Sequence, residues 1–197
     1  MPEVSERFRT AHGREWNQND VAIMYQSFEK HLFASLQDFT TPVPGVIETM
    51  EQLRREGIRI GSTTGYTDAM MKIVQPGAAA QGYTVDCLVT PARRLNRELI
   101  YRNMTELAIP SVDEVVKVGD TIADIREGLN AKVCSVGVIT GSNELGLTEE
   151  EYKTMPEPEL YTLKQEVRER MMAAGAHYVL DNIRELPDLI HNLMNKK

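Results

Sequence analysis

Two carboxylates that follow a predicted strand are the first residues here whose type and spacing could carry chemistry. Residues 115–119 read VVKVG, an apolar run with one lysine, and Asp120, Thr121 and Asp124 follow. Open α/β sheets keep their sites at the carboxyl edge of the strands, and Mg²⁺ prefers oxygen ligands. The run therefore predicts a magnesium site, with Asp120 and Asp124 as metal-binding and catalytic residues. The alternative is a plain strand exit, with Asp124 in the first turn of a helix, where a carboxylate favours the helix dipole.

Two further strand ends carry groups that could bind a phosphoryl group. Residues 62–65 read STTG and precede a helix that could begin near Thr67. Backbone N–H groups, a hydroxyl and a helix N-terminus together form a phosphate cradle, although a threonine here could simply cap the helix. Arg93 and Arg94 follow another strand end, where an arginine could clamp a phosphoryl oxygen or lie in a solvated loop. Together the three strand ends describe phosphoryl transfer with a divalent cation.

The rest of the chain alternates between the helical and the extended pattern. Strands are predicted over 57–63, 86–91, 115–121, 134–141 and 176–181. Helices are predicted over 5–15, 19–38, 45–56, 67–80, 95–108, 122–131, 148–174 (broken at Met155-Pro156) and 183–195. Such alternation favours an α/β fold, a parallel sheet with helices on both faces. The Pro/Gly-rich segment 40–46 is the best linker, so we expect a helical unit over 1–40 and a core over 41–197.

Composition narrows the classes of partner and the compartment. The 197 residues carry a net charge of −7, which argues against a nucleic-acid surface. No apolar run is long enough to span a membrane, and the first residues lack the apolar core of a secretory signal. Cys87 and Cys134 lie in separate strand-like runs and are better explained as small buried residues than as a disulfide or metal pair. We expect a cytoplasmic protein without nucleic-acid or membrane partners.

Stretches spread over nearly the whole chain match one known family. They lie at 12–14, 20–33, 42–46, 57–74, 81–91, 115–131, 136–151 and 174–181. The most specific are GSTTGYT at 61–67 and SNELGLTEEE at 142–151. On these residues the chain resembles the phosphonoacetaldehyde hydrolases (phosphonatases) of the haloacid dehalogenase superfamily. The resemblance implies a Rossmann-like core with a parallel sheet and a helical cap.

The same resemblance implies a reaction, with Mg²⁺ as the cofactor and a small-molecule phosphonate as the substrate. A cap-domain lysine forms a Schiff base with the aldehyde, and an aspartate on the first core strand attacks phosphorus. The C–P bond breaks to give acetaldehyde, and the aspartyl phosphate is hydrolysed, a step of phosphonate degradation. Asp120 would bind Mg²⁺ directly, and Asp124 would support the metal from the next helical turn. The substrate-binding residues would be Ser62, Thr63, the catalytic Thr64, Gly65, Tyr66, and Arg93 or Arg94.

The chain also departs from the family pattern. The family's D-x-A-G-T motif, which carries the nucleophilic aspartate, is absent, and no lysine precedes Lys30. The loop after residue 91 is shorter than in the family and lacks its G-R-P run, so either arginine could substitute. Losing members of a catalytic unit costs many powers of ten in rate, so we expect impaired hydrolysis. The alternatives are a non-catalytic phosphate- and Mg²⁺-binding module, or a fragment complemented by a separate N-terminal chain.

The missing first strand has a consequence for folding. In the superfamily it lies between the strands predicted at 57–63 and 115–120, so its absence leaves two unpaired inner edges. Either these two strands pair directly, or another chain fills the gap, or the protein is unstable, and we expect strain and association. The helix at 19–38, which contributes to a dimer contact in the family, would expose Tyr25, Phe28 and Phe33. The alternative is that this apolar stripe folds onto the core.

Overall fold

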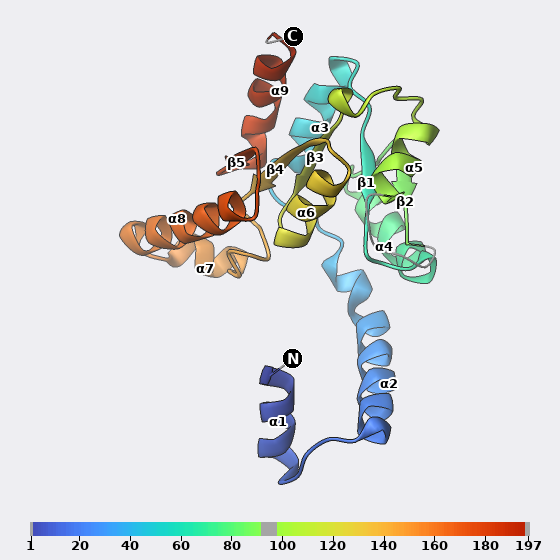
Figure 1. Cartoon of the computed structure of the whole chain (residues 1–197), viewed down its shortest axis with the longest axis vertical. Helices are drawn as coiled ribbons and strands as arrows, with labels where there is room; N and C mark the ends of the chain where they lie inside the picture. The colour runs from blue at the N-terminus through green and yellow to red at the C-terminus, as the bar shows by residue number, and fades with distance from the viewer. Residues whose placement is uncertain (1, 92–97, 196–197) are drawn as a thin grey trace.

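The computed structural model describes residues 2–91 and 98–195 and has an α/β fold (Figure 1). The strands are β1 (Gly61–Thr63), β2 (Cys87–Val89), β3 (Val116–Gly119), β4 (Cys134–Val138) and β5 (Tyr178–Leu180). The helices are α1 (Pro2–His12), α2 (Gln18–Ser35), α3 (Val46–Arg55), α4 (Asp68–Ala80), α5 (Glu98–Glu106), α6 (Ile122–Asn130), α7 (Glu149–Thr154), α8 (Glu157–Ala173) and α9 (Leu186–Met194). Short 3₁₀ turns are η1 (Leu36–Phe39), η2 (Val112–Glu114) and η3 (Ile183–Glu185). The predicted fold class and order of elements are confirmed.

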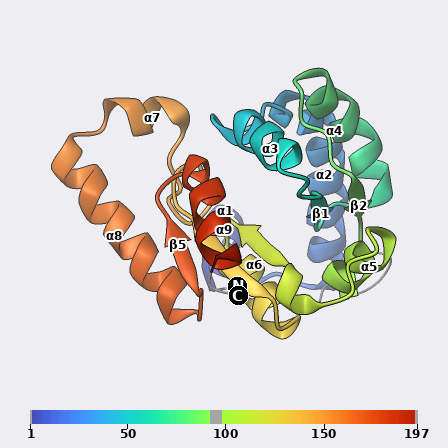
Figure 2. The ribbon, with the colours of Figure 1, turned by 90° about the horizontal axis from the view of Figure 1, so that it is seen from above.

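The strands are all parallel, but they form two sheets instead of one. One sheet has the order β1-β2 and the other β3-β4-β5. Thr63 pairs with Val89 in the first, and Val136 pairs with both Val118 and Tyr178 in the second. Among the described residues no main-chain ladder joins β1 to β3. Seen from above, β1 and β2 with α4 and α5 lie apart from β5 and α8 (Figure 2). Of the three alternatives for the strands beside the missing one, direct pairing of β1 with β3 is therefore not observed.

Helices cover both faces of the three-stranded sheet. On one face α6 and α8 contribute fully buried side chains, among them Ile125 and Met171. On the other face Leu53 of α3 and Leu186 of α9 pack against Val136 and Leu180 of the sheet. Each helix buries a single apolar stripe, as expected when a parallel sheet is covered on both sides. This layered core fixes the orientation of β3, at whose end the predicted carboxylates stand.

Helix α5 helps to hold the two sheets together. It contacts both β1 and β2, and its Ile100 packs against Ala131 and Val133, which follow α6. The hydroxyl of Tyr101 also donates to the carbonyl of Ala131 at 3.2 Å. Side-chain packing therefore connects the sheets where strand hydrogen bonds do not.

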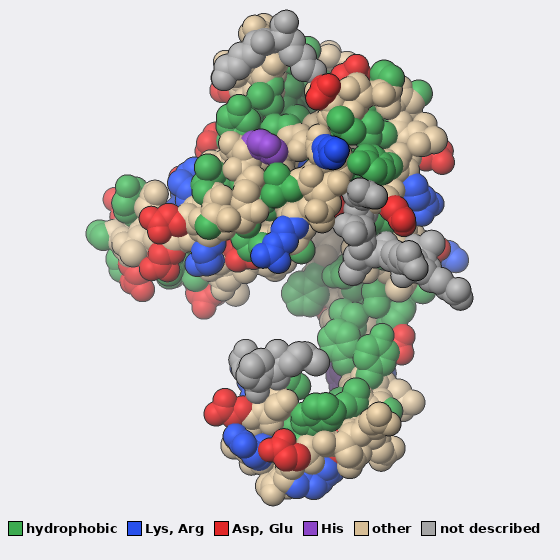
Figure 3. Space-filling model, in the orientation of Figure 1, with side chains coloured by type: hydrophobic (Ala, Val, Ile, Leu, Met, Phe, Trp, Pro, Cys, Tyr) green, Lys and Arg blue, Asp and Glu red, His purple; other side chains and the backbone are tan. Residues whose placement is uncertain are grey.

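The N-terminal helices stand away from the sheets (Figure 1). Helix α2 has no buried residue; Tyr25 and Phe28 are 64% and 60% exposed, and Phe33 is half-buried. Figure 3 shows hydrophobic side chains gathered along this part of the molecule. The turn η1 follows α2 and packs against α4, burying Leu36. The predicted division of the chain at residue 40 remains a prediction.

Several predicted elements are shorter than expected, for local reasons. The strand predicted from residue 57 begins at Gly61. The N–H groups of Gly57 and Ile58 donate to carbonyls of α3, and that of Ile60 donates to the carboxylate of Asp86 at 2.7 Å. The last helix is preceded by η3, whose first turn is capped by Asn182. The predicted break at Met155-Pro156 is confirmed, since α7 ends at Thr154 and α8 begins at Glu157; Thr148 caps α7. Within the described residues, no helix is both long and apolar enough to cross a membrane.

Candidate functional site

Asp120 stands directly after β3, at the carboxyl edge of the three-stranded sheet. Its Oδ2 accepts a hydrogen bond from the backbone N–H of Asn143 at 2.9 Å. The preceding Gly119 is required by close packing, since a Cβ there would lie 2.2 Å from the Cβ of Asp124. Strand end and helix start therefore touch, and the two predicted carboxylates are brought to the same edge.

Asp124 serves as a helix cap and as an ion-pair partner. It forms a capping box with Thr121, whose Oγ1 donates to Asp124 Oδ2 at 2.6 Å. Its Oδ1 lies 2.9 Å from Lys117 Nζ. Burial alone would raise the pKa of Asp124, but the charge of Lys117 and the hydrogen bonds from Thr121 outweigh it, so the pKa is lowered. Because both oxygens are engaged, this geometry suits a supporting role better than direct ligation, and the metal role stays a prediction.

Asn143 and Glu144, in the turn after β4, hold the carboxylate edge in place, by which we mean Asp120 and Asp124 after β3. Neither residue was predicted as a site residue. Besides the Asn143 contact, Oε1 of Glu144 accepts the N–H of Ile122 at 3.1 Å, in the first turn of α6. Arg170 of α8 lies 3.6 Å from Glu144 and also donates to its carbonyl at 2.7 Å. The signal was present in the SNELGLTEEE motif, which by itself indicated kinship but no contact.

The predicted phosphate-binding turn, residues 62–65, includes the end of β1 and leads into α4. We call it the hydroxyl turn. Thr64 Oγ1 accepts the N–H of Tyr66 at 3.1 Å, and Thr67 caps the helix by accepting the N–H of Met70 at 3.4 Å. A Cβ at Gly65 would meet nothing within 4 Å, so the backbone there faces open space. The capping alternative is thus observed at Thr67, while the turn before it keeps the exposed backbone that an anion would need.

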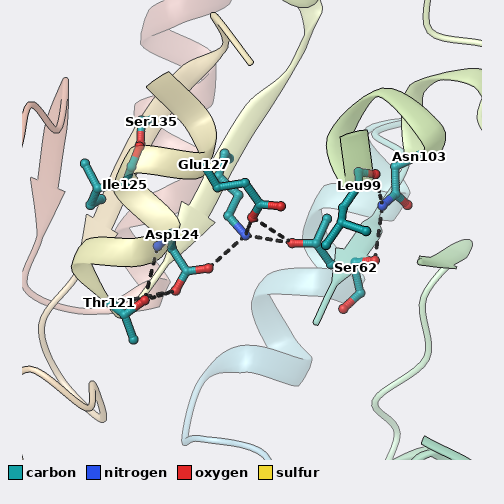
Figure 4. A network of polar contacts seen from close by, with 10 residues as sticks. Ser62, Leu99, Asn103, Thr121, Asp124, Ile125, Glu127 and Ser135 are labelled. Atoms are coloured by element: carbon teal, nitrogen blue, oxygen red, sulfur yellow. Dashed lines mark hydrogen bonds and ion pairs between the residues drawn. The ribbon is translucent and has the colours of Figure 1, made fainter. Parts of the chain in front are cut away.

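Lys117 connects this turn to the carboxylate edge. Its ammonium lies 2.8 Å from Thr63 Oγ1 and 2.8 Å from Glu127 Oε2, besides the contact to Asp124. Thr63 in turn donates to Glu127 at 3.1 Å. Asp124 and Glu127 point from α6 toward the side where Ser62 lies (Figure 4). Thr63 therefore belongs to an internal network and is less available to a substrate than the sequence predicted.

The ammonium of Lys117 is held in its charged form. Its side chain is 11% exposed, and burial would lower its pKa, but Asp124 and Glu127 outweigh burial and raise the pKa. Neither Lys117 nor Glu127 was predicted as a site residue. The sequence did carry a signal, since a lysine interrupts an otherwise apolar strand.

Two predictions remain, the arginines that would bind the phosphonate and the Mg²⁺ site. Arg93 and Arg94 lie outside the described residues, so their role stays a prediction. In the part of the chain that is described, no group of three or more His, Cys, Asp or Glu side chains could hold a metal ion. Mg²⁺ is commonly bound through one or two carboxylates, with water and substrate phosphate completing its octahedron. The oxygen donors at this edge therefore fit Mg²⁺, and they do not fit a closed all-protein metal cage.

Comparison with known proteins defines the class. The profile of the haloacid dehalogenase-like hydrolases matches residues 2–138, and the chain belongs to that class. Within it, the chain belongs to the phosphonoacetaldehyde hydrolase family. A phosphonoacetaldehyde hydrolase from Parabacteroides distasonis is 65% identical over the whole chain, which covers 76% of that relative. One from Bacteroides fragilis is 55% identical with the same coverage. A crystal structure of a phosphonoacetaldehyde hydrolase-like protein from Oleispira antarctica matches 99% of this chain and 72% of its own, with 28% identity and a TM-score of 0.88.

The Asp124 contacts predict a pH-dependent loss of stability. Because folding lowers the pKa of Asp124, its carboxylate stabilises the fold above the ordinary aspartate pKa of about 3.9, and this contribution is lost as the pH falls through the folded-state value. We expect Asp124→Asn to cost about 1–3 kcal/mol at pH 7, with the difference from the native chain shrinking below pH ~4. Urea unfolding in metal-free buffer at several pH values measures it. Asp188→Asn is the control, because Asp188 is an exposed residue in the first turn of α9; equal effects of the two substitutions would contradict the prediction.

Proposed function

We propose that this chain carries the metal-binding and phosphoryl-binding half of a phosphonoacetaldehyde hydrolase site. The reaction cleaves the C–P bond of phosphonoacetaldehyde to give acetaldehyde and phosphate, a step of phosphonate degradation. The observation that supports it most is the joining of the two candidate groups. Asp120 and Asp124 stand at the end of β3, the hydroxyl turn follows β1, and Lys117 contacts both sides. The family of the relatives supplies the substrate class.

The carboxylate edge would hold Mg²⁺. Asp120, oriented by the N–H of Asn143, would be the direct ligand, and Asp124 would act through hydrogen bonds. The ion supplies positive charge that neutralises the phosphonate oxygens. Glu144 keeps the first turn of α6 in place, which fixes the position of Asp120 relative to the helix.

The hydroxyl turn would orient the phosphonate. The backbone around Gly65 faces open space before the start of α4, where N–H groups and the helix dipole favour an anion, and the half-buried Thr64 directly precedes it. Ser62 lies two residues before Thr64, and Tyr66 directly follows Gly65. Positioning and charge neutralisation account for most of the catalysis of phosphoryl transfer. The hydroxyls and backbone N–H groups of residues 62–66 suit both tasks. Arg93 or Arg94 would add a cation to the same oxygens.

The nucleophile and the Schiff-base lysine are proposed to come from a segment outside these 197 residues. An extended segment between β1 and β3 could pair with both open edges and bring its own side chains to the carboxyl edge. Two facts support this proposal. The edges do not pair with each other, and the relatives are longer than the part that this chain matches. The chain by itself would then bind metal and phosphate but hydrolyse phosphonoacetaldehyde poorly. Its two free cysteines suit a reducing compartment, and we propose the cytoplasm.

Acetaldehyde release tests this proposal. The purified chain with Mg²⁺ and phosphonoacetaldehyde should release no more acetaldehyde than a blank. Adding the segment of the Parabacteroides distasonis relative that the match leaves uncovered should restore release. In that restored mixture, Asp120→Asn should lower the rate of release by about two or more powers of ten. Asp188→Asn serves as the matched control.

The outcomes separate the competing functions. Mg²⁺-dependent release by the chain alone, lost in Asp120→Asn, would show that the chain holds its own nucleophile. Tight binding of phosphate and Mg²⁺ with no turnover, even after the segment is added, would instead favour a non-catalytic binding module.

We also propose a homodimer through α2, supported by its exposed aromatic residues. Burying one phenylalanine is worth about 1.5–3 kcal/mol, so Phe28→Glu should weaken association about tenfold or more. Phe39→Glu, at an exposed phenylalanine outside α2, should leave it unchanged. Sedimentation velocity over a concentration series measures both variants. A native chain that stays monomeric and melts in one sharp transition would contradict the proposal.

A further inference from the structure

Lys117 lies where the two sheets face each other without strand hydrogen bonds. Its ammonium contacts Thr63 of β1 at 2.8 Å and two carboxylates of α6 at 2.8 and 2.9 Å. This one ammonium group therefore binds both β1 of the two-stranded sheet and helix α6, which packs on the three-stranded sheet. We infer that Lys117 is a positioning residue that ties the hydroxyl turn after β1 to the carboxylate edge after β3.

The side chain is suited to this task by its length and its environment. Strands that are next-but-one in a sheet lie about 9.6 Å apart, and lysine has a four-carbon stem that can span part of such a distance. Its side chain is 11% exposed, and that of Glu127 is 14% exposed. Moving an ammonium out of water is costly unless it is paired and hydrogen-bonded. A buried lysine with three oxygen partners satisfies that condition, and loss of Lys117 would leave the Asp124 and Glu127 carboxylates without the cation that they share.

The tie places geometric demands on both halves of the site. Thr63 immediately precedes Thr64. The contact that fixes the Thr63 hydroxyl therefore also fixes the start of the hydroxyl turn. Lys117 also holds Asp124 Oδ1, while Thr121 holds Oδ2, so the carboxylate cannot rotate freely beside Asp120. This second part of the inference rests on the proposed function; the mechanical tie does not.

A second lysine in the chain provides a matched control. Lys164 of α8 lies 2.8 Å from Asp181 Oδ2 and its side chain is 16% exposed. Its side chain is thus about as buried as that of Lys117, although the side chain of Asp181 is 41% exposed, and the pair joins α8 to the residue after β5, away from the gap between the sheets. Lys117→Met and Lys164→Met remove the same charge and keep the apolar stem.

The tie is tested by a double-mutant cycle with Thr63→Val, followed by urea unfolding. If Lys117 and Thr63 act together, the shift in the unfolding midpoint for the double variant should be clearly smaller than the sum of the two single shifts. The cycle of Lys164→Met with Thr63→Val should be additive. Additivity in both cycles would overturn the inference.

A distance measurement adds a readout that general destabilisation does not move. Spin labels are placed at exposed Thr105 of α5 and Glu169 of α8, in a background without the two cysteines. Lys117→Met should broaden the distance distribution between them, and Lys164→Met, at equal loss of stability, should leave it unchanged. A distribution in Lys117→Met as narrow as in the native chain would overturn the inference even if that variant unfolds more easily.

Calorimetric titration with MgCl₂ alone tests the link to the site. Loss of a group that supports a metal ligand typically weakens affinity ten- to a hundredfold, and we expect about that for Lys117→Met. Unchanged affinity would overturn the positioning role. If the native chain binds no Mg²⁺, the proposed function fails, and the cycle and the label distances still decide whether Lys117 ties the sheets.

Discussion

The absence of main-chain hydrogen bonds between β1 and β3 is the constraint on which the rest of the structure depends. Strand edges carry rows of N–H and C=O groups that require partners, and here two such edges face the same gap. The chain holds the sheets together by other means. Helix α5 packs its Ile100 against the segment after α6, and Lys117 places a buried charge among oxygens from both sides.

This constraint also locates the candidate site. In a parallel sheet the carboxyl ends of the strands share one edge, and ligands bind where neighbouring strands diverge. Asp120 and the hydroxyl turn both lie at strand ends next to the gap, and one lysine contacts the residues beside them. The relatives are named phosphonoacetaldehyde hydrolases. An extended segment between β1 and β3 would bring its side chains between the carboxylates after β3 and the hydroxyl turn after β1. Folding and function would then depend on the same strand.

Much of the fold could be predicted from the sequence, because it rests on local signals. Apolar periodicity placed the helices, and Met155-Pro156 marked the break between α7 and α8. Contacts between distant residues could not be predicted in the same way. That Lys117 would reach Thr63 depends on how the two sheets are packed together. That Asn143 would hold Asp120 depends on the path of the turn after β4 beside the end of β3. Asp124 shows the difference well, since its spacing from Asp120 predicted a metal site, while the structure gives both of its oxygens protein partners.

The most direct test of this account is backbone hydrogen exchange at β1 and β3. In the chain alone, rapid exchange is expected at the amides of Gly61–Thr63 that point away from β2 and at those of Val116–Gly119 that point away from β4. The amides of β4, which is paired on both sides, should stay protected. Adding the uncovered segment of the Parabacteroides distasonis relative should slow exchange at both edges together. Strong protection of these outward-pointing amides of β1 and β3 in the chain alone, or no change when the segment is added, would contradict the account of a site divided by an open strand position.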